Sequence, residues 1–300
     1  MFDHSKIDFQ VEKFPLWSID PALMQVPTNV SVGIRRTDNR VPLAVVSEEY
    51  EPVQYRDIVS GVEEALNLAL LDLTDATFTT NVYDNGAKLE LRATFPAHKM
   101  SMREGKDSMV PEFVFRTSHN RTWANSGMMG LWRAFCYNTL VSGDKLAYVY
   151  GRHTKNFNVG EFASKVKAAG EFISGEGLTQ MRGWYDTKVS RDGAINLFTN
   201  TLAQRTDNVS RKKVANKVML SNLMKIFDEE NRHLHGQGAY EGYGKRDEGT
   251  LWSAYNAATY WSSHANSKIG ANHNIRVTRE DKVRKMLASP EWTELETAVH

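Results

Sequence analysis

Cysteine is nearly absent from this sequence, since Cys136 is the only one in 300 residues. One cysteine excludes an internal disulfide framework and a four-cysteine zinc site, and it is typical of a protein from a reducing compartment. The sequence also lacks an uncharged apolar run long enough to cross a bilayer, and its N-terminus, MFDHSKIDFQVEKF, is too polar for a signal peptide. We therefore expect a cytoplasmic protein with no membrane partner.

An excess of charge of either sign is lacking too. Lys and Arg total 37 against 36 Asp and Glu, a formal net charge of +1, and 41% of the residues are hydrophobic. This composition is that of an ordinary globular chain, long enough for one large or two modest domains. A net charge this close to zero does not attract the chain as a whole to nucleic acid. Any site for a polyanion must therefore come from basic residues gathered in one part of the chain.

Motifs of known enzyme classes are missing as well. The sequence contains no Walker loop, no GxSxG elbow and no dinucleotide fingerprint. His233 and His235 stand two residues apart with no HExxH pattern or nearby cysteine to complete a metal site. A thiol dyad of Cys136 with His119 or His153 is a weaker explanation than a buried cysteine between Phe135 and Tyr137. We predict no catalytic residue, no metal and no cofactor.

Local patterns favour an α+β fold. Asp84-Asn85-Gly86 lies between alternating runs at 76–83 and 87–95, which predicts a β-hairpin. Apolar residues recur at helical spacing over 55–71 and again after Val159. We expect a small antiparallel sheet packed against helices, followed by a mainly helical C-terminal half.

Three regions follow from these patterns. Residues 1–46 carry four prolines and no sustained period, which indicates an irregular N-terminal arm. Residues 47–158 form the α+β core, and residues 159–300 form the mainly helical region. Within the latter, 231–250 is rich in glycine, tyrosine and charge, which predicts a flexible loop.

The segment 112–155 combines basic residues with aromatic rings. We expect a strand at 113–115, a polar loop, a helix at 128–141 and a second strand at 146–150. Basic side chains bind phosphates and aromatic faces stack on bases. The candidates for nucleic-acid contact here are Arg116, His119, Arg121, Trp123, Arg133, Tyr150, Arg152, His153 and Lys155. The alternative is an ordinary basic surface over a core that includes Trp132.

A second basic segment follows at 205–225, where six cations oppose Asp207. Its candidates for nucleic-acid contact are Arg211, Lys212 and Lys213. The apolar spacing from Val214 to Phe227 predicts a helix, so the alternative is that these lysines lie on a solvated helix face.

Four short motifs occur in order: Arg116-Thr117-Ser118-His119, Arg133–Leu140, Arg152-His153 and Gly249–Tyr260. In this arrangement the sequence resembles the phage and plasmid family of domain of unknown function 932, over roughly 50–264. The resemblance implies a mobile-element origin, and hence the host cytoplasm for a phage-encoded protein. It implies no established activity.

Our main functional hypothesis is a phage-type protein that binds single-stranded DNA, with strand annealing by a homo-oligomer as its most specific form. Such a protein needs a basic groove and stacking rings but no catalytic group. At the coarsest level, a hairpin followed by a helix also resembles strand-annealing recombinases. One alternative is a protein that binds and antagonises a host defence or host polymerase. Another is a metal-dependent nuclease that uses either Asp72 and Asp75 or Asp228, Glu229 and Glu230.

Overall fold

The structure is a computed structural model. It describes residues 1–19, 25–69, 73–103, 106–133, 138–140, 148–151, 159–207, 210–235, 248–264 and 273–298. The chain divides into two compact units: unit 1 consists of Met1–His98, Pro111–Met129 and Asp144–Glu171, and unit 2 of Lys99–Val110, Gly130–Gly143 and Phe172–His300. Helices and antiparallel sheets are both present, which confirms the α+β class.

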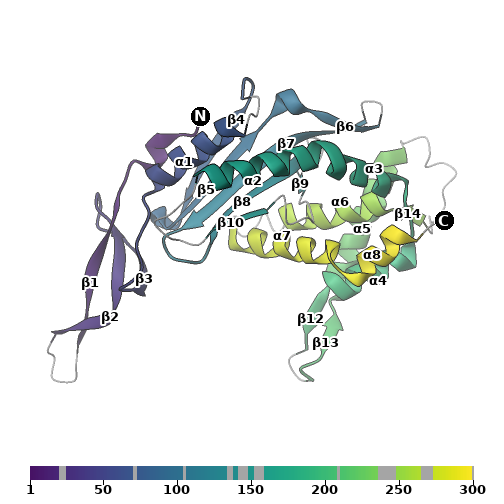
Figure 1. The fold of residues 1–300 in the computed structure, drawn as a ribbon. Coiled ribbons are helices and arrows are strands. Elements are labelled where there is room, and N and C mark those ends of the chain that lie inside the picture. Colours follow the sequence, from purple (N-terminus) through teal and green to yellow (C-terminus); the bar gives the residue numbers. More distant parts are fainter. Residues whose placement is uncertain are drawn as a thin grey trace. The chain divides into compact units, whose positions relative to one another are not determined.

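Unit 1 begins with a three-stranded antiparallel sheet of β1 (Val11–Ile19), β2 (Gln25–Arg36) and β3 (Pro42–Ser47), in that order (Figure 1). The prediction of an irregular arm is therefore wrong over these strands. Two of the prolines occupy places that a strand tolerates: Pro15 lies on the edge strand beside a shift in register, and Pro42 is the first residue of β3. Pro27 lies in β2 opposite Trp17, outside the stretch of β2 that pairs with β3.

The main sheet of unit 1 has the order β10-β8-β7-β5-β4. Its strands are β4 (Thr77–Tyr83), β5 (Lys88–Thr94), β7 (Lys106–Ser118), β8 (Asn125–Arg133) and β10 (Tyr148–Gly151). β4 and β5 form the predicted hairpin, and the turn places Asn85 and Gly86 at φ of 57° and 106°. This left-handed conformation explains why Asn-Gly predicts the turn so well.

The helix predicted at 128–141 is wrong, because this stretch begins as β8. Met128 and Leu131 pair with β10 and with the short strand β9 (Asn138–Leu140), respectively. Residues 127–131 are all buried. A strand that is buried on both faces has a continuous apolar run, which spacing alone does not distinguish from a buried helix.

Two helices, α1 (Tyr55–Leu68) and α2 (Val159–Phe172), lie in front of this sheet in Figure 1. Phe162 of α2 packs edge-on against Phe113 and Phe115 of β7, with ring centroids 6.0 and 5.7 Å apart. Successive strand residues point to opposite faces, so these phenylalanines mark the apolar face of the sheet. The intervening residues of β5 and β7 form the other face.

A short 3-10 helix, η1 (His4–Ile7), covers the edge strand β4. The backbone N–H of Asp3 donates to Thr80 Oγ1 at 2.9 Å, and Lys6 Nζ donates to the carbonyl oxygen of Thr80 at 3.0 Å. The ring of Phe2 packs edge-on against that of Phe78 at 5.0 Å. The first residues of the chain thus close part of the sheet's edge.

Unit 2 confirms the mainly helical C-terminal half. Its helices are α3 (Leu178–Asp186), α4 (Arg191–Thr201), α5 (Lys217–His235), α6 (Leu251–Ser263), α7 (His273–Leu287) and α8 (Pro290–Thr297), with a π-helical turn, Ile173–Gly177, ahead of α3. α6 is buried from Leu251 to Thr259, and its Tyr255 ring lies 5.1 Å from Trp184 and 6.3 Å from Trp292. Of the helices in the described part of the chain, none combines enough length with enough apolar character to cross a membrane.

Short strands complete unit 2. β6 (Met100–Arg103) pairs with the first part of β7, and β11 (Lys188–Ser190) pairs with β14 (Glu248–Thr250). The flexible loop predicted at 231–250 is thus wrong at both ends, since 231–235 belong to α5 and 248–250 to β14. Its middle, 236–247, lies outside the described residues.

Candidate nucleic-acid interface

Arg116 lies on the sheet face opposite Phe115, where it is only 8% exposed. Its Nε donates to Glu90 Oε2 at 2.8 Å, across the β5–β7 pair. Arg92 Nε donates to the other oxygen of that carboxylate at 2.8 Å, and Arg92 Nη1 donates to Glu112 Oε1 at 3.2 Å. We call these four residues the ionic face. The prediction that Arg116 contacts a phosphate is wrong, because its guanidinium is buried against a carboxylate.

The ionic face balances its own charge. Glu90 and Glu112 are 4% exposed, and an ion buried to this extent costs several kcal/mol unless a partner compensates it. Burial alone would lower the pKa of Arg92, but the two carboxylates outweigh burial and raise it. These arginines therefore hold the sheet together and are not available to a ligand in solution.

His119 and Trp123 are also buried, at 2% and 4% exposure. The His119 ring stacks on Tyr55 of α1 with centroids 4.1 Å apart. The Trp123 ring meets Tyr83 edge-on at 5.9 Å, and Lys88 Nζ lies 5.5 Å from its centroid. Neither ring has a free face for a base, so the predictions that they contact nucleic acid are wrong.

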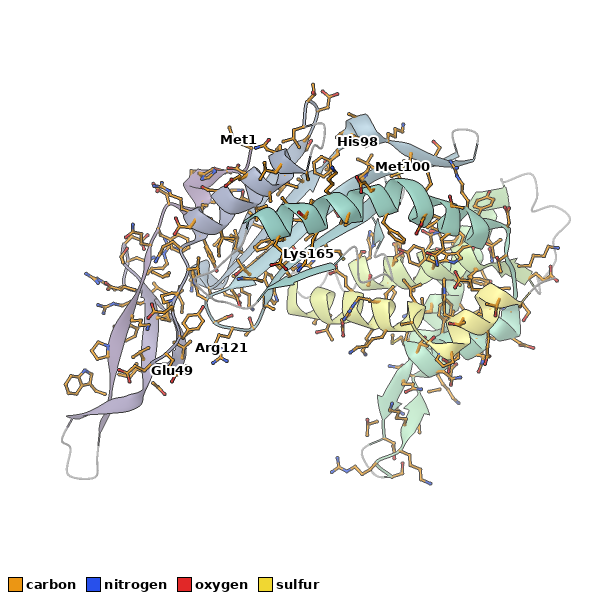
Figure 2. All side chains as sticks on the ribbon, in the orientation of Figure 1. Met1, Glu49, His98, Met100, Arg121 and Lys165 are labelled. Carbon is orange, nitrogen blue, oxygen red and sulfur yellow. The ribbon has the colours of Figure 1, made fainter. Side chains whose placement is uncertain are left out.

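Arg121 is the one candidate of the first basic segment whose side chain the structure describes as exposed. It stands at the turn between β7 and β8 and points away from the ribbon (Figure 2). Asn120 holds this turn, since its Oδ1 accepts from the backbone N–H of Thr122 at 3.2 Å. The φ of Arg121 is 60°, a left-handed value that costs a non-glycine residue about 1–2 kcal/mol. Contact of Arg121 with a phosphate stays a prediction.

The remaining candidates of the first segment are not tested. Arg133 is the last residue of β8, paired with Asn138, and Tyr150 lies in β10, paired with Ser126. The structure describes the backbone of both but not their side chains. Arg152, His153 and Lys155 lie outside the described residues.

The second basic segment forms a hairpin instead of a helix face. β12 (Gln204–Thr206) pairs antiparallel with β13 (Lys213–Ala215), and α5 begins only at Lys217. The backbone N–H of Asp207 donates to the carbonyl of Lys212 at 2.9 Å, which continues the pairing toward the tip. Arg211, Lys212 and Lys213 are all exposed on this hairpin. They do not lie on a helix face, but they are exposed to solvent, as the alternative expected.

Two further cations lie in or next to this hairpin. Arg205 lies in β12, Lys217 is the first residue of α5 just after β13, and both are exposed. The sequence already indicated them, because between positions 205 and 217 five cations stand against the single acid Asp207. We call Arg205, Arg211, Lys212, Lys213 and Lys217 the hairpin cations.

The hairpin cations have no carboxylate partner among the described residues. Asp207 Oδ2 accepts from the backbone N–H of Ser210 at 2.7 Å. Three exposed lysines elsewhere in unit 2 do pair: Lys188 with Glu248 at 3.6 Å, Lys225 with Glu229 at 3.9 Å and Lys285 with Asp281 at 2.7 Å. The exposed Lys99 and Lys282 have no ion pair among the described residues, but they stand singly, whereas the hairpin cations lie within 13 positions of the sequence.

The residues considered for catalysis gain no support. Asp228 pairs with Arg191, Asp75 is exposed, and Asp72 and Cys136 lie outside the described residues. Across the part of the chain that the structure describes, no three His, Cys, Asp or Glu residues are grouped to hold a metal ion.

Comparison with known proteins gives one finding. A family model described as Domain of unknown function (DUF932) matches residues 42–289. No curated protein and no solved structure matches the chain.

Proposed function

Because this chain belongs to the family Domain of unknown function (DUF932), whose name assigns no activity, we propose from its own residues that it binds single-stranded nucleic acid. The hairpin cations supply the phosphate contacts in this proposal. Annealing of complementary strands by a homo-oligomer is its more specific form, for which the order of hairpin, sheet and helix α2 in unit 1 offers only a coarse analogy.

The observation that carries the proposal is the set of unpaired cations on one exposed hairpin. Five like charges stand between positions 205 and 217, while Asp207 accepts a hydrogen bond from the backbone N–H of Ser210. Like charges repel one another over a Debye length of about 8 Å. A polyanion relieves this repulsion and gains entropy by releasing its condensed counterions. Lysines already paired with carboxylates gain less, because a phosphate must displace the partner.

The proposal predicts a defined salt dependence. For single strands, the logarithm of the binding constant falls with the logarithm of salt concentration by about 0.7 for each phosphate contact. Five contacts therefore give a slope of about −3.5. Because backbone contacts carry no sequence information, we expect little preference among oligonucleotides of equal length.

The test compares two triple variants of unit 2 that lose the same charge. One is R211Q/K212Q/K213Q in the hairpin. The other is K188Q/K225Q/K285Q, whose lysines are 68%, 75% and 73% exposed and paired with carboxylates. Fluorescence anisotropy with a labelled single-stranded oligonucleotide over a salt series measures the affinity of each, and a thermal melt checks that each is folded.

We expect the hairpin variant to lose roughly 30-fold in affinity, with a slope about 2 smaller in magnitude, while the matched control stays within about threefold of the original protein. Equal losses in both variants would mean that only net charge matters. Absence of any salt-sensitive binding by the original protein would overturn the proposed function, and degradation of the oligonucleotide would favour a nuclease.

A second candidate function rests on the N-terminal sheet of unit 1. Trp17 of β1 is 56% exposed and Val45 of β3 is 66% exposed. An exposed tryptophan is a frequent anchor of protein interfaces. Binding of a host protein through this sheet is therefore the alternative, and in that case the original protein would show no salt-sensitive binding of the oligonucleotide.

A further inference from the structure

The two faces of the β12–β13 hairpin both carry positive charge. Residues directly opposite each other in an antiparallel pair point to the same face. Arg205 is opposite Val214, and Thr206 is opposite Lys213. Since Val214 and Lys213 are neighbours in β13, their side chains point to opposite faces. Arg205 and Lys213 therefore project in opposite directions from one ribbon.

The ribbon is open to solvent on both faces. Arg205, Thr206, Lys213 and Ala215 are exposed, although they are divided between the two faces. Figure 1 shows β12 and β13 extending away from the helices α4 and α5 of the same unit. The hairpin is anchored only at its base, where the backbone N–H of Asn216 donates to the carbonyl of Ala203 at 2.6 Å and Ala203 is buried.

A ribbon with cations on both faces suits a partner that surrounds it with phosphates. The major groove of B-form DNA is about 12 Å wide and admits a two-stranded β-ribbon, with a phosphate backbone along each wall. Sheets that pack face to face lie about 10 Å apart, so a ribbon that enters edge-first, with one face toward each wall, has a thickness that fits that width.

We infer that the β12–β13 hairpin inserts into the major groove of double-stranded DNA, with Arg205 and Lys213 directed to opposite backbones and Arg211 at the tip. This inference rests on the proposed function and extends it: the hairpin that contacts a single strand also holds the paired product. The major groove of an A-form RNA duplex is deep and narrow. The hairpin therefore selects a DNA duplex over an RNA duplex.

The experiment measures salt-dependent affinity for three labelled probes of equal length: single-stranded DNA, double-stranded DNA and double-stranded RNA. The variants are R205Q, K213Q and the double variant, with T206A as a matched uncharged control on the same exposed ribbon. All three positions are exposed, so we expect unchanged thermal melts.

For the DNA duplex we expect each single variant to lower the magnitude of the salt slope by about 0.9 and the double variant by about 1.8. T206A should match the original protein, and binding to the RNA duplex should not depend on Arg205 or Lys213. The inference is overturned if only one of the two cations affects duplex binding, or if the RNA duplex depends on both. Single-strand binding measured in parallel separates this failure from a failure of the proposed function, in which no probe binds.

Discussion

The β5–β7 pair of unit 1 and the β12–β13 hairpin of unit 2 are both antiparallel and both rich in cations, yet their environments are opposite. In the sheet, Arg92 and Arg116 are held on the carboxylate of Glu90 and lie within the interior. In the hairpin, Arg205 and Lys213 are exposed and have no such partner among the described residues. A buried cation needs a compensating negative charge beside it, whereas a cation in solvent does not. The same side chains are thus structural in one pair and available to a ligand in the other.

Removing the shared carboxylate is the strongest test of this difference. Glu90→Gln leaves Arg92 with Glu112 alone and takes from Arg116 its contact across the strands. We expect a loss of about 3–5 kcal/mol in the free energy of unfolding, because a buried charge loses its compensation. Urea unfolding followed by circular dichroism measures it.

The matched control for Glu90→Gln is Glu248→Gln, which breaks the exposed pair with Lys188. Exposed pairs contribute about 0–1 kcal/mol, so this variant should unfold near the original midpoint. A similar small effect for Glu90→Gln would mean that the ionic face is not a structural element.

A double-mutant cycle measures how strongly the ionic face is coupled. Arg116→Met and Glu90→Gln each disrupt the same contact, so the double variant should be less destabilised than the sum of the two. We expect a coupling free energy of about 1–3 kcal/mol from urea unfolding of the four proteins. Additive effects would show that Arg116 and Glu90 do not act on each other.

Measurements at alkaline pH test the buried interior independently of the hairpin. Burial raises the pKa of Tyr55 and of Tyr255 above the usual value of about 10. The unfolded chain then loses phenolic protons that the folded chain keeps, so stability is complete below about pH 10 and falls as the pH rises. Each tyrosine contributes at most about 1.4 kcal/mol per pH unit.

The free energy of unfolding measured between pH 9 and 11.5 gives the slope of stability against pH. Tyr255→Phe should remove the contribution of one tyrosine to that slope. An unchanged slope in that variant would contradict the role of Tyr255. Oligonucleotide affinity over the same range should be the same for Tyr255→Phe as for the original protein, because Tyr255 is buried in unit 2 away from solvent.

The smallest expected effect concerns the turns. Arg211 has a φ of 57°, and Arg121, at the turn of unit 1, has a φ of 60°. Glycine adopts this conformation without the steric cost, so Arg211→Gly should leave stability unchanged or raise it by less than about 1 kcal/mol. Its affinity for a single strand should fall about threefold, because one phosphate contact is lost. Thermal melts and anisotropy measure both. Arg40 also has a φ of 60° and pairs with Glu12, so Arg40→Gly is the control with the same backbone change.

The fold was predictable where the signal is local. Asp84-Asn85-Gly86 predicted a hairpin because its backbone conformation depends on these residues themselves, and α1 followed from its apolar spacing. The strand β8 was not predictable in this way, because burial on both faces removes the alternation that marks a strand. The N-terminal sheet was hidden by prolines that its edge and its first positions accept.

The site was less predictable, because charge density along the chain says nothing about pairing across strands. Glu90 and Arg116 stand 26 residues apart, and only the register of β5 with β7 brings them together. Arg211, Lys212 and Lys213 were correctly placed in one basic segment. Whether they lie on a helix or a hairpin depends on where α5 begins. The apolar spacing predicted a helix from Val214, whereas α5 begins at Lys217.

The contacts that the start of the chain makes with Thr80 restrict how copies of this protein associate. An open strand edge acts as a template on which a strand from another molecule adds. Lys6 and Asp3 occupy hydrogen-bonding atoms of Thr80, so β4 offers no uninterrupted template there. We therefore expect copies of this protein to join through surfaces other than this stretch of β4, and an intermolecular sheet that grows from it would first have to displace η1.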